Sequence, residues 1–108
     1  MTGKIVVLST AGSAEEAERL ARGLIEAHLA ACVNIVPGIR SIYRWLGAVQ
    51  DESEFLLVIK TRRPLLPKVQ QTIASLHSYS VPESIALPIV DGATAYLDWL
   101  DRETEQDS

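Results

Sequence analysis

The sequence predicts a single α+β domain in which two helices alternate with four β-strands and a short helix follows the last strand. Three observations lead to this class. Runs rich in β-branched and other apolar residues are typical of strands. Two other segments repeat apolar residues at intervals of three and four, as amphipathic helices do. Turn-forming Gly, Pro and Ser residues separate the segments, and the 108 residues contain neither an internal repeat nor a linker.

The first strand and the first helix are predicted from residues 5 to 30. Residues 5–8 are continuously apolar, which suits a central strand covered on both faces. Ser13 and Glu16 then match a capping box, in which each side chain satisfies a backbone amide of the other residue. Apolar residues recur at helical spacing up to His28, so we expect a helix to about Ala30, with His28 at its buried edge as a packing or capping residue.

Residues 32–45 form the most distinctive stretch of the chain. They read as one long strand, rich in β-branched and aromatic residues and kinked at Pro37-Gly38. Such a strand would measure roughly 45 Å, whereas a compact domain of this size has a diameter of roughly 34 Å. The strand is therefore expected to project from its own domain and to expose apolar residues. Another copy of the chain would cover them, so an oligomer is expected.

The remaining elements complete the predicted order. Residues 47–50 are expected to turn the chain back into a strand over residues 55–60. Pro64 and Pro67 belong in the first turn of a second helix, residues 84–90 read as a last strand with Pro88 marking a sheet edge, and a short helix should cover residues 93–103. Residues 104–108 are expected to form a frayed, polar tail of this one domain, residues 1–108.

Right-handed crossovers turn this order into a ferredoxin-like βαββαβ sandwich with a long kinked hairpin and a short C-terminal helix, two helices covering one face of an antiparallel sheet. Because many unrelated functions use this fold, the fold alone does not identify a function.

Composition excludes some classes of function. A formal net charge of −4 argues against binding nucleic acid through bulk charge. No apolar run is long enough for a signal peptide or a membrane span, which predicts a cytoplasmic protein without a membrane partner. The single Cys agrees with a reducing compartment and cannot form an internal disulfide. No cofactor is expected to be needed for folding.

His77 and Glu83 are the main candidates for a chemical role. A His and a Glu six residues apart in an extended or turned segment could meet one divalent ion, since imidazole suits copper or zinc and a carboxylate adds charge. Two ligands are too few for a tight site. A third would have to come from a distant segment or a neighbouring subunit, with Cys32, Lys60 and Ser9 the side chains to consider.

Purely structural roles are an alternative for each candidate. His77 could cap the second helix at its C-terminus, and Glu83 could pair with Arg44 or Lys60. Cys32 could be a small buried thiol. Trp45 could belong to an interface or core instead of lining a pocket. The sequence contains no Gly-rich phosphate loop and no Gly-x-Ser-x-Gly elbow, and nothing near His77 resembles a nucleophile, so we do not expect an enzyme.

Several motifs resemble the CutA family of divalent-cation tolerance proteins. Residues 31–38, Ala-Cys-Val-Asn-Ile-Val-Pro-Gly, together with residues 41–45, Ser-Ile-Tyr-Arg-Trp, look like the signature strand of that family. Four further pieces agree and span nearly the whole chain in the right order: residues 6–11, Lys60-Thr61, the segment His77-x-Tyr79-x-Val81-Pro82-Glu83, and Tyr96-Leu97-x-Trp99.

The resemblance implies a homotrimer that exchanges its long strands between subunits, with a fold akin to the PII signalling proteins and an association with copper and other divalent metal ions. The ligand positions usually proposed for the family fall on Ser9, His77 and Glu83 in this chain. Ser9 departs from the family, which has Cys there, and a hydroxyl is a poor copper ligand. Cys32 matches a family Cys that is usually read as a packing residue.

Two hypotheses follow. The first is a non-enzymatic, trimeric divalent-cation tolerance protein that binds Cu²⁺ or another divalent ion weakly through His77 and Glu83. The second is a PII-like trimeric regulator or scaffold whose intersubunit cleft holds a small anion or metabolite. Candidate residues for that cleft are Lys60, Tyr79, Trp45 and Arg44.

Overall fold

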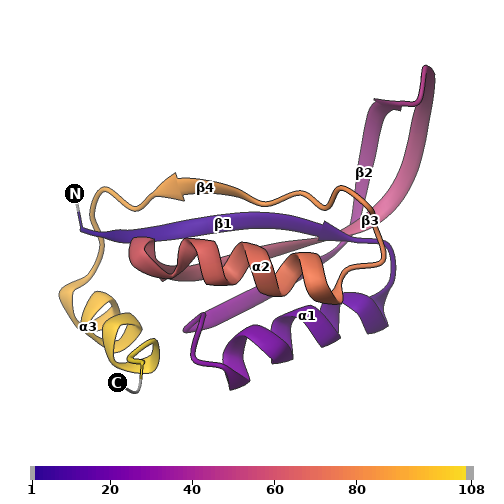
Figure 1. Ribbon diagram of the computed structural model, residues 1–108. Helices are drawn as coiled ribbons and strands as arrows, with labels where there is room; N and C mark the ends of the chain where they lie inside the picture. Colours follow the sequence, from indigo (N-terminus) through magenta and orange to yellow (C-terminus); the bar gives the residue numbers. More distant parts are fainter. Residues whose placement is uncertain (1, 107–108) are drawn as a thin grey trace.

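The computed structural model describes residues 2–106. Four strands and three α-helices follow one another along the described chain, and Figure 1 labels them. The elements are β1 (Lys4–Ala11), α1 (Ala14–Glu26), β2 (Cys32–Trp45), β3 (Ala48–Arg62), α2 (Leu66–Leu76), β4 (Ile85–Pro88) and α3 (Thr94–Glu103), with a 3₁₀ turn at Arg63–Leu65 before α2. None of the helices in the described part of the chain is both long and apolar enough to span a membrane.

The four strands form one sheet in the order β2-β3-β1-β4, and all neighbouring strands run antiparallel. Helices α1 and α2 both cover one face of this sheet, and α3 lies at the end near the N-terminus (Figure 1). The predicted α+β class, the four-stranded antiparallel sheet and the presence of three helices are therefore confirmed. As Pro88 suggested, β4 is an edge strand.

The hydrophobic core lies between the sheet and the two crossover helices. Alternate residues of β1 and β3 face the helices, and Val7, Leu57 and Ile59 are fully buried there. Leu20 and Leu24 of α1 and Val69 of α2 meet them from the helical side. Because the side chains of a strand alternate between its two faces, the intervening residues of β1 and β3 must point to the opposite face of the sheet.

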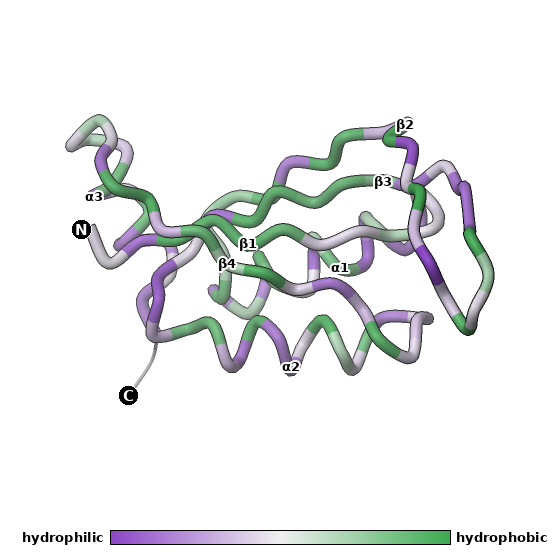
Figure 2. Tube along the Cα trace, turned by 90° about the horizontal axis from the view of Figure 1, so that it is seen from above, coloured by the Kyte–Doolittle hydropathy of each residue, from purple (hydrophilic) through white to green (hydrophobic). Residues whose placement is uncertain are grey.

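None of the described helices covers that opposite face, yet the face is largely apolar. Val6 and Leu8 of β1 lie on it beside Val58 of β3, and all three are only half-buried. Ile85 and Leu87 of β4 are paired with Leu8 and Val6 and are about half exposed. Seen from above in Figure 2, β1, β3 and β4 lie side by side with long hydrophobic stretches. We call this surface the open face.

The distal half of the β2–β3 hairpin leaves the sheet. The register shifts between Val36 and Ile39, where Gly38 has φ +72°, a backbone conformation that favours glycine. Beyond this bulge the hairpin bends away from the body of the molecule (Figure 1), and the longest dimension of the chain is 44 Å. The predicted strand over residues 32–45 and its projection are confirmed.

Several element boundaries differ from the predictions. Strand β1 continues to Ala11 instead of ending near Leu8, and β4 is shorter than the predicted residues 84–90. The turn of the hairpin is Leu46-Gly47 instead of residues 47–50, and β3 begins at Ala48, so the polar residues near position 52 belong to a strand. Helix α1 ends at Glu26, not near Ala30. His28 takes a positive φ of 56° and is exposed, where its Nδ1 lies 3.1 Å from the Glu103 carbonyl oxygen.

The polar tail starts later than residue 104. Thr104 is fully buried, and its hydroxyl accepts a 2.8 Å hydrogen bond from Nε of Arg62. Gln106 donates to the carbonyl oxygen of His28. These contacts hold the end of α3 against β3 and the end of α1, while residues 107–108 lie outside the described residues.

Candidate functional site

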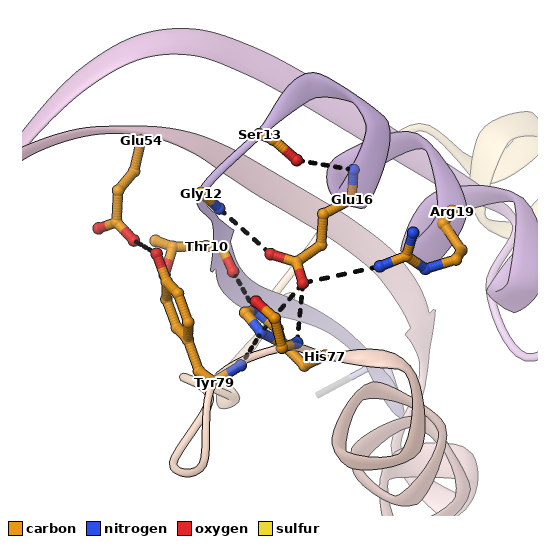
Figure 3. A network of polar contacts seen from close by, with 9 residues as sticks. Thr10, Gly12, Ser13, Glu16, Arg19, Glu54, His77 and Tyr79 are labelled. Carbon is orange, nitrogen blue, oxygen red and sulfur yellow. Dashed lines mark hydrogen bonds and ion pairs between the residues drawn. The ribbon is translucent and has the colours of Figure 1, made fainter.

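The segment after α2 is held by the side chain of His77. This residue ends α2, and its imidazole is fully buried. Nε2 lies 2.6 Å from the carbonyl oxygen of Thr10, which can only accept a hydrogen bond, so Nε2 carries the proton. Nδ1 is then free to accept the backbone N–H of Tyr79 at 3.0 Å. Both ring nitrogens are therefore used within the chain, as Figure 3 shows.

Glu16 connects the same segment to the start of α1. Its backbone N–H donates to the Ser13 hydroxyl, as the capping box predicts. Its carboxylate, 5% exposed, accepts the backbone N–H groups of Gly12 at 3.3 Å and Ser78 at 2.8 Å (Figure 3). Burial raises the pKa of this carboxyl, but the hydrogen bonds from Ser78 and Gly12 outweigh burial and leave the pKa below its ordinary value.

Tyr79 reaches from this segment to the hairpin. Its hydroxyl donates a 2.7 Å hydrogen bond to Oε2 of Glu54, which is 5% exposed. Burial, followed by the bond and the charge of Glu54, raises the pKa of Tyr79. A Cβ atom at Gly12 would lie 3.1 Å from the Tyr79 hydroxyl oxygen, so a side chain at position 12 would press on this ring. The Tyr79–Glu54 bond thus holds the segment against β3, while the His77–Thr10 bond holds it against β1.

A cavity of about 770 Å³ opens between the distal half of the hairpin and residues 79–83. Its wall contains three aromatic rings, three carboxylates and one guanidinium. These residues are Tyr43, Trp45 and Tyr79, then Glu52, Glu54 and Glu83, and finally Arg40.

Negative charge dominates the wall of this cavity. Arg40 forms a two-point ion pair with Asp51, at 2.8 and 2.6 Å, so its charge is already matched within the hairpin. Burial raises the pKa of the Glu83 carboxyl, and the charge of Glu54 raises it further. Glu83 and Glu54 are thus close enough to influence each other, and no positive side chain in the wall is left to balance them.

The structure brings together only some of the residues that the sequence singled out. Trp45, Tyr79 and Glu83 line the cavity, whereas Lys60 and Arg44 do not. Lys60 instead donates to the Asn34 side chain, and Arg44 lies opposite Val49 in the hairpin. The ion pair of Glu83 with Arg44 or Lys60 considered above is absent from the described residues.

Ser9 and Cys32 lie elsewhere. Ser9 is on the helix-facing side of β1, fully buried, and its hydroxyl has no hydrogen-bond partner among the described residues. Cys32 begins β2, opposite Lys60, and its thiol is 3.9 Å from the Asn34 side-chain oxygen. It is half-buried, so the expectation of a buried thiol holds only in part.

A metal ion does not fit these residues within one chain. His77 would have to give up a hydrogen bond to bind a metal, and the Ser9 hydroxyl is a weak donor for copper. Across residues 2–106, no three His, Cys, Asp or Glu side chains are grouped closely enough to hold one ion. A tight site would need ligands from another copy of the chain.

The sequence did not reveal three residues that shape this region. Glu16 was recognised as a helix cap, but its second bond, to Ser78, joins residues 62 positions apart. Glu54 and Thr10 carried no local signal, because a carboxylate near a predicted turn and a hydroxyl at a strand end are common. Alternation along β3 would have indicated Glu54, had the strand been recognised as extending to Ala48.

Comparison with known proteins gives a consistent result. The family model described as "CutA1 divalent ion tolerance protein" matches residues 5–103. The divalent-cation tolerance protein CutA of Thermus thermophilus is 52% identical over 99 residues, covering 92% of this chain and 96% of that protein. The chloroplastic protein CutA of Arabidopsis thaliana is 50% identical over 93% of this chain, which spans 55% of its length.

Solved structures agree with these matches. The divalent cation tolerance protein Cut A1 from Thermus thermophilus superposes with a TM-score of 0.92 at 50% identity, covering 94% of this chain and 99% of that one. CutA1 from Oryza sativa gives a TM-score of 0.93 at 48% identity, covering 99% of this chain and 100% of that one.

Proposed function

The chain belongs to the CutA1 divalent ion tolerance family, and from this premise we propose that it is a non-enzymatic, homotrimeric divalent-cation tolerance protein. It binds Cu²⁺ or other divalent ions weakly, and copies of the chain complete the site. The observation that carries this proposal is the uncovered apolar surface on the open face and the hairpin.

Assembly would cover two surfaces that the single chain leaves exposed. On the hairpin, Ile42 and Val49 are each 63% exposed. On the open face, Ile85 and Leu87 remain half exposed beside the half-buried Val58. Apolar surface of this extent on two adjoining regions is unusual for a monomer. The strand order β2-β3-β1-β4 also supports assigning the chain to the ferredoxin-like folds.

Weak metal binding is expected because both ring nitrogens of His77 are already hydrogen-bonded within the chain. A metal ion at His77 must replace either the bond to Thr10 or the bond from Tyr79. Glu83 can contribute its carboxylate from the cavity wall, and its neighbour Glu54 favours any cation there. Binding should therefore be limited by the cost of releasing the imidazole, which is a reason to expect low affinity.

Two measurements test the proposal. Sedimentation equilibrium should give three times the mass of the chain at micromolar concentration, and a folded monomer would contradict it. Calorimetry with Cu²⁺ should then compare the wild type with His77→Ala and Glu83→Gln. Weaker binding by both variants is expected, and unchanged binding by both would remove these residues from the site. Glu26→Gln, an exposed carboxylate at the end of α1, is the matched control.

A second candidate function is favoured by the cavity itself. A PII-like trimeric regulator or scaffold would hold a small molecule, and about 770 Å³ lies in the range of small-molecule sites. The wall is negatively charged, which does not favour the anion expected from the sequence. We also retain the cytoplasmic location as a proposal, supported by a single Cys that has no disulfide partner.

A further inference from the structure

We propose that the cavity between the β2–β3 hairpin and residues 79–83 binds an organic cation with several amino groups, that is, a molecule of the polyamine class. The proposal rests on three features of the wall: its charge, its aromatic rings, and two buried polar side chains that reach it.

The charge of the wall selects for a cation. Glu52, Glu54 and Glu83 all line the cavity, and the only guanidinium in the wall, that of Arg40, is paired with Asp51. Ammonium groups form charge-assisted hydrogen bonds with carboxylates. Three carboxylates carried by two separate segments, β3 and residues 79–83, can each receive a different amino group.

The aromatic rings favour an organic cation over a hydrated inorganic one. Tyr43 and Trp45 come from β2, and Tyr79 comes from the facing segment. Aromatic faces attract alkylammonium groups through their quadrupole and contact the methylene groups between them. Tyr43 is also close to the acidic residues, since burial first and the charge of Glu52 second raise its pKa.

Two side chains more than nine-tenths buried contribute polar groups to the wall. Glu54 is 5% exposed, and only its Oε2 is used by Tyr79. Thr10 is 9% exposed, and no hydrogen bond to its hydroxyl occurs within residues 2–106. Because Thr10 lines the cavity, its hydroxyl faces space that a ligand can occupy. The Thr10 hydroxyl can accept one N–H of an ammonium group.

The geometry of the cavity also favours this ligand over a single metal ion and over an anion. A single metal ion needs ligands that converge on one point, and the carboxylates of the described residues do not converge in this way. An anion would meet three negative groups and no unmatched positive one. An extended molecule with several spaced ammonium groups satisfies dispersed carboxylates and rings at once.

The inference goes beyond the proposed metal function, although both use Glu83. It specifies the ligand class for the cavity that favours the second candidate function. Because the cavity adjoins the hairpin, where copies of the chain are proposed to meet, the test must use the assembled protein. The two proposals separate experimentally, since Glu52 should matter for the organic cation and not for Cu²⁺.

The test is calorimetric titration of the assembled protein with spermidine at low salt. Butylamine, with one amino group, is the comparison ligand and should bind at least about tenfold more weakly. The double variant Glu52→Gln/Glu83→Gln should lose at least about tenfold in spermidine affinity. The double variant Glu15→Gln/Glu26→Gln changes the net charge equally at exposed positions of α1 and should keep its affinity. The single variant Glu52→Gln, which changes neither proposed metal ligand, should weaken spermidine binding and leave Cu²⁺ binding unchanged.

Three results would overturn the inference. These are no spermidine binding by the wild type, equal losses in both double variants, and equal affinity for spermidine and butylamine. Cu²⁺ binding that persists in any of these cases would leave the metal proposal standing. If the Glu52→Gln/Glu83→Gln protein fails to assemble, the single variant Glu52→Gln decides, because Glu52 is exposed. It should lose about threefold, and an unchanged affinity counts against the site.

Discussion

The two faces of the sheet bury similar side chains to very different extents. On the helix-facing side, Val7, Leu57 and Ile59 are fully buried against α1 and α2. On the open face and the hairpin, apolar residues of the same kinds remain exposed, among them Ile42 and Val49 at 63% each. All of these residues fit a pleated strand, so local preference does not distinguish them. What differs is whether the same chain supplies a covering layer.

This difference suggests that the residues of the two faces have separate roles, one in folding and one in assembly. The helix-facing side is completed by the chain itself and should determine whether the protomer folds. The open face and the hairpin contribute little to a single chain and should determine assembly. Substitutions on the helix-facing side should therefore change the free energy of unfolding of a single chain. Substitutions on the open face and the hairpin should change assembly. A substitution that changes both would contradict this separation of roles.

The largest effect on folding is expected for Leu20→Ala. Leu20 is fully buried in α1, and removing its side chain leaves a cavity that costs about 3 kcal/mol in the free energy of unfolding. The matched substitution on the other side is Ile42→Ala, which should change the unfolding of a single chain by less than about 0.5 kcal/mol.

Urea unfolding at several protein concentrations measures both the stability of a single chain and the contribution of assembly, because assembly makes stability depend on concentration. Ile42→Ala should mainly reduce the concentration dependence. A concentration-independent loss at Ile42 comparable to that of Leu20→Ala would show that the hairpin belongs to the folding core.

Glu16→Ala tests the connection between the start of α1 and the segment that follows α2. The substitution leaves the backbone N–H groups of Gly12 and Ser78 without their acceptor, so it should cost about 2 kcal/mol at neutral pH. Glu18→Ala is the control, since Glu18 is exposed and bonds only to Arg22 on the helix surface. It should cost less than about 0.5 kcal/mol.

The effect of Glu16 should also depend on pH. Folding lowers the pKa of this carboxyl below its ordinary value of 4.5. The stabilisation is therefore complete above pH 4.5 and is lost as the pH falls through the lower, folded value. The gap in unfolding free energy between the wild type and Glu16→Ala should narrow at about pH 3. A gap that widens in acid would reverse the assigned sign.

Ser9→Ala tests how a buried hydroxyl without a hydrogen-bond partner in residues 2–106 affects stability on the helix-facing side of the sheet. The buried Ser9 hydroxyl has no partner among the described residues, so its removal should stabilise the protein by about 1 kcal/mol. Thr61 on the same face is the control, because its hydroxyl donates a 2.6 Å bond to the carbonyl oxygen of Leu29. Thr61→Val should destabilise by about 1 kcal/mol. Thermal unfolding should show opposite shifts, and equal losses would mean that Ser9 has a partner in solution.

The fold could be predicted from the sequence wherever a local pattern and the final structure agree. The strand over residues 32–45 was located correctly, because runs rich in β-branched and aromatic residues flank the kink at Pro37-Gly38. The start of β3 was missed because Asp51 and Glu52 look like a polar turn, although on a projecting hairpin both faces of a strand meet solvent. The end of α1 was placed too late, because a left-handed residue at His28 stops the helix without a Gly.

The candidate site was less predictable than the fold. His77 and Glu83 were identified by their chemistry and spacing, but the partners of His77 come from β1 and from the backbone of Tyr79. Those contacts depend on how α2 docks against the sheet, which no local pattern encodes. The acidic character of the cavity was missed for a related reason. It depends on Glu54, which is buried only because the hairpin bends towards Tyr79.

The smallest expected effect on folding concerns the tip of the hairpin. Leu46 and Gly47 both have positive φ, 51° and 81°, in a two-residue turn that strongly prefers Asn-Gly. Leu is strained there and 89% exposed, so its side chain gives the single chain no benefit. Leu46→Asn should therefore raise the stability of a single chain by about 0.5 kcal/mol.

A leucine that strains its own turn and points into solvent is understandable if another copy of the chain buries it. Leu46→Asn should then weaken assembly while it relaxes the turn, and sedimentation equilibrium and urea unfolding measure the two effects separately. Gly47→Ala is the control, because it strains the same turn without removing an apolar side chain. If Leu46→Asn stabilises the chain and leaves assembly unchanged, the turn at Leu46-Gly47 lies outside the interface between copies. The assembly residues of the hairpin would then end before Leu46.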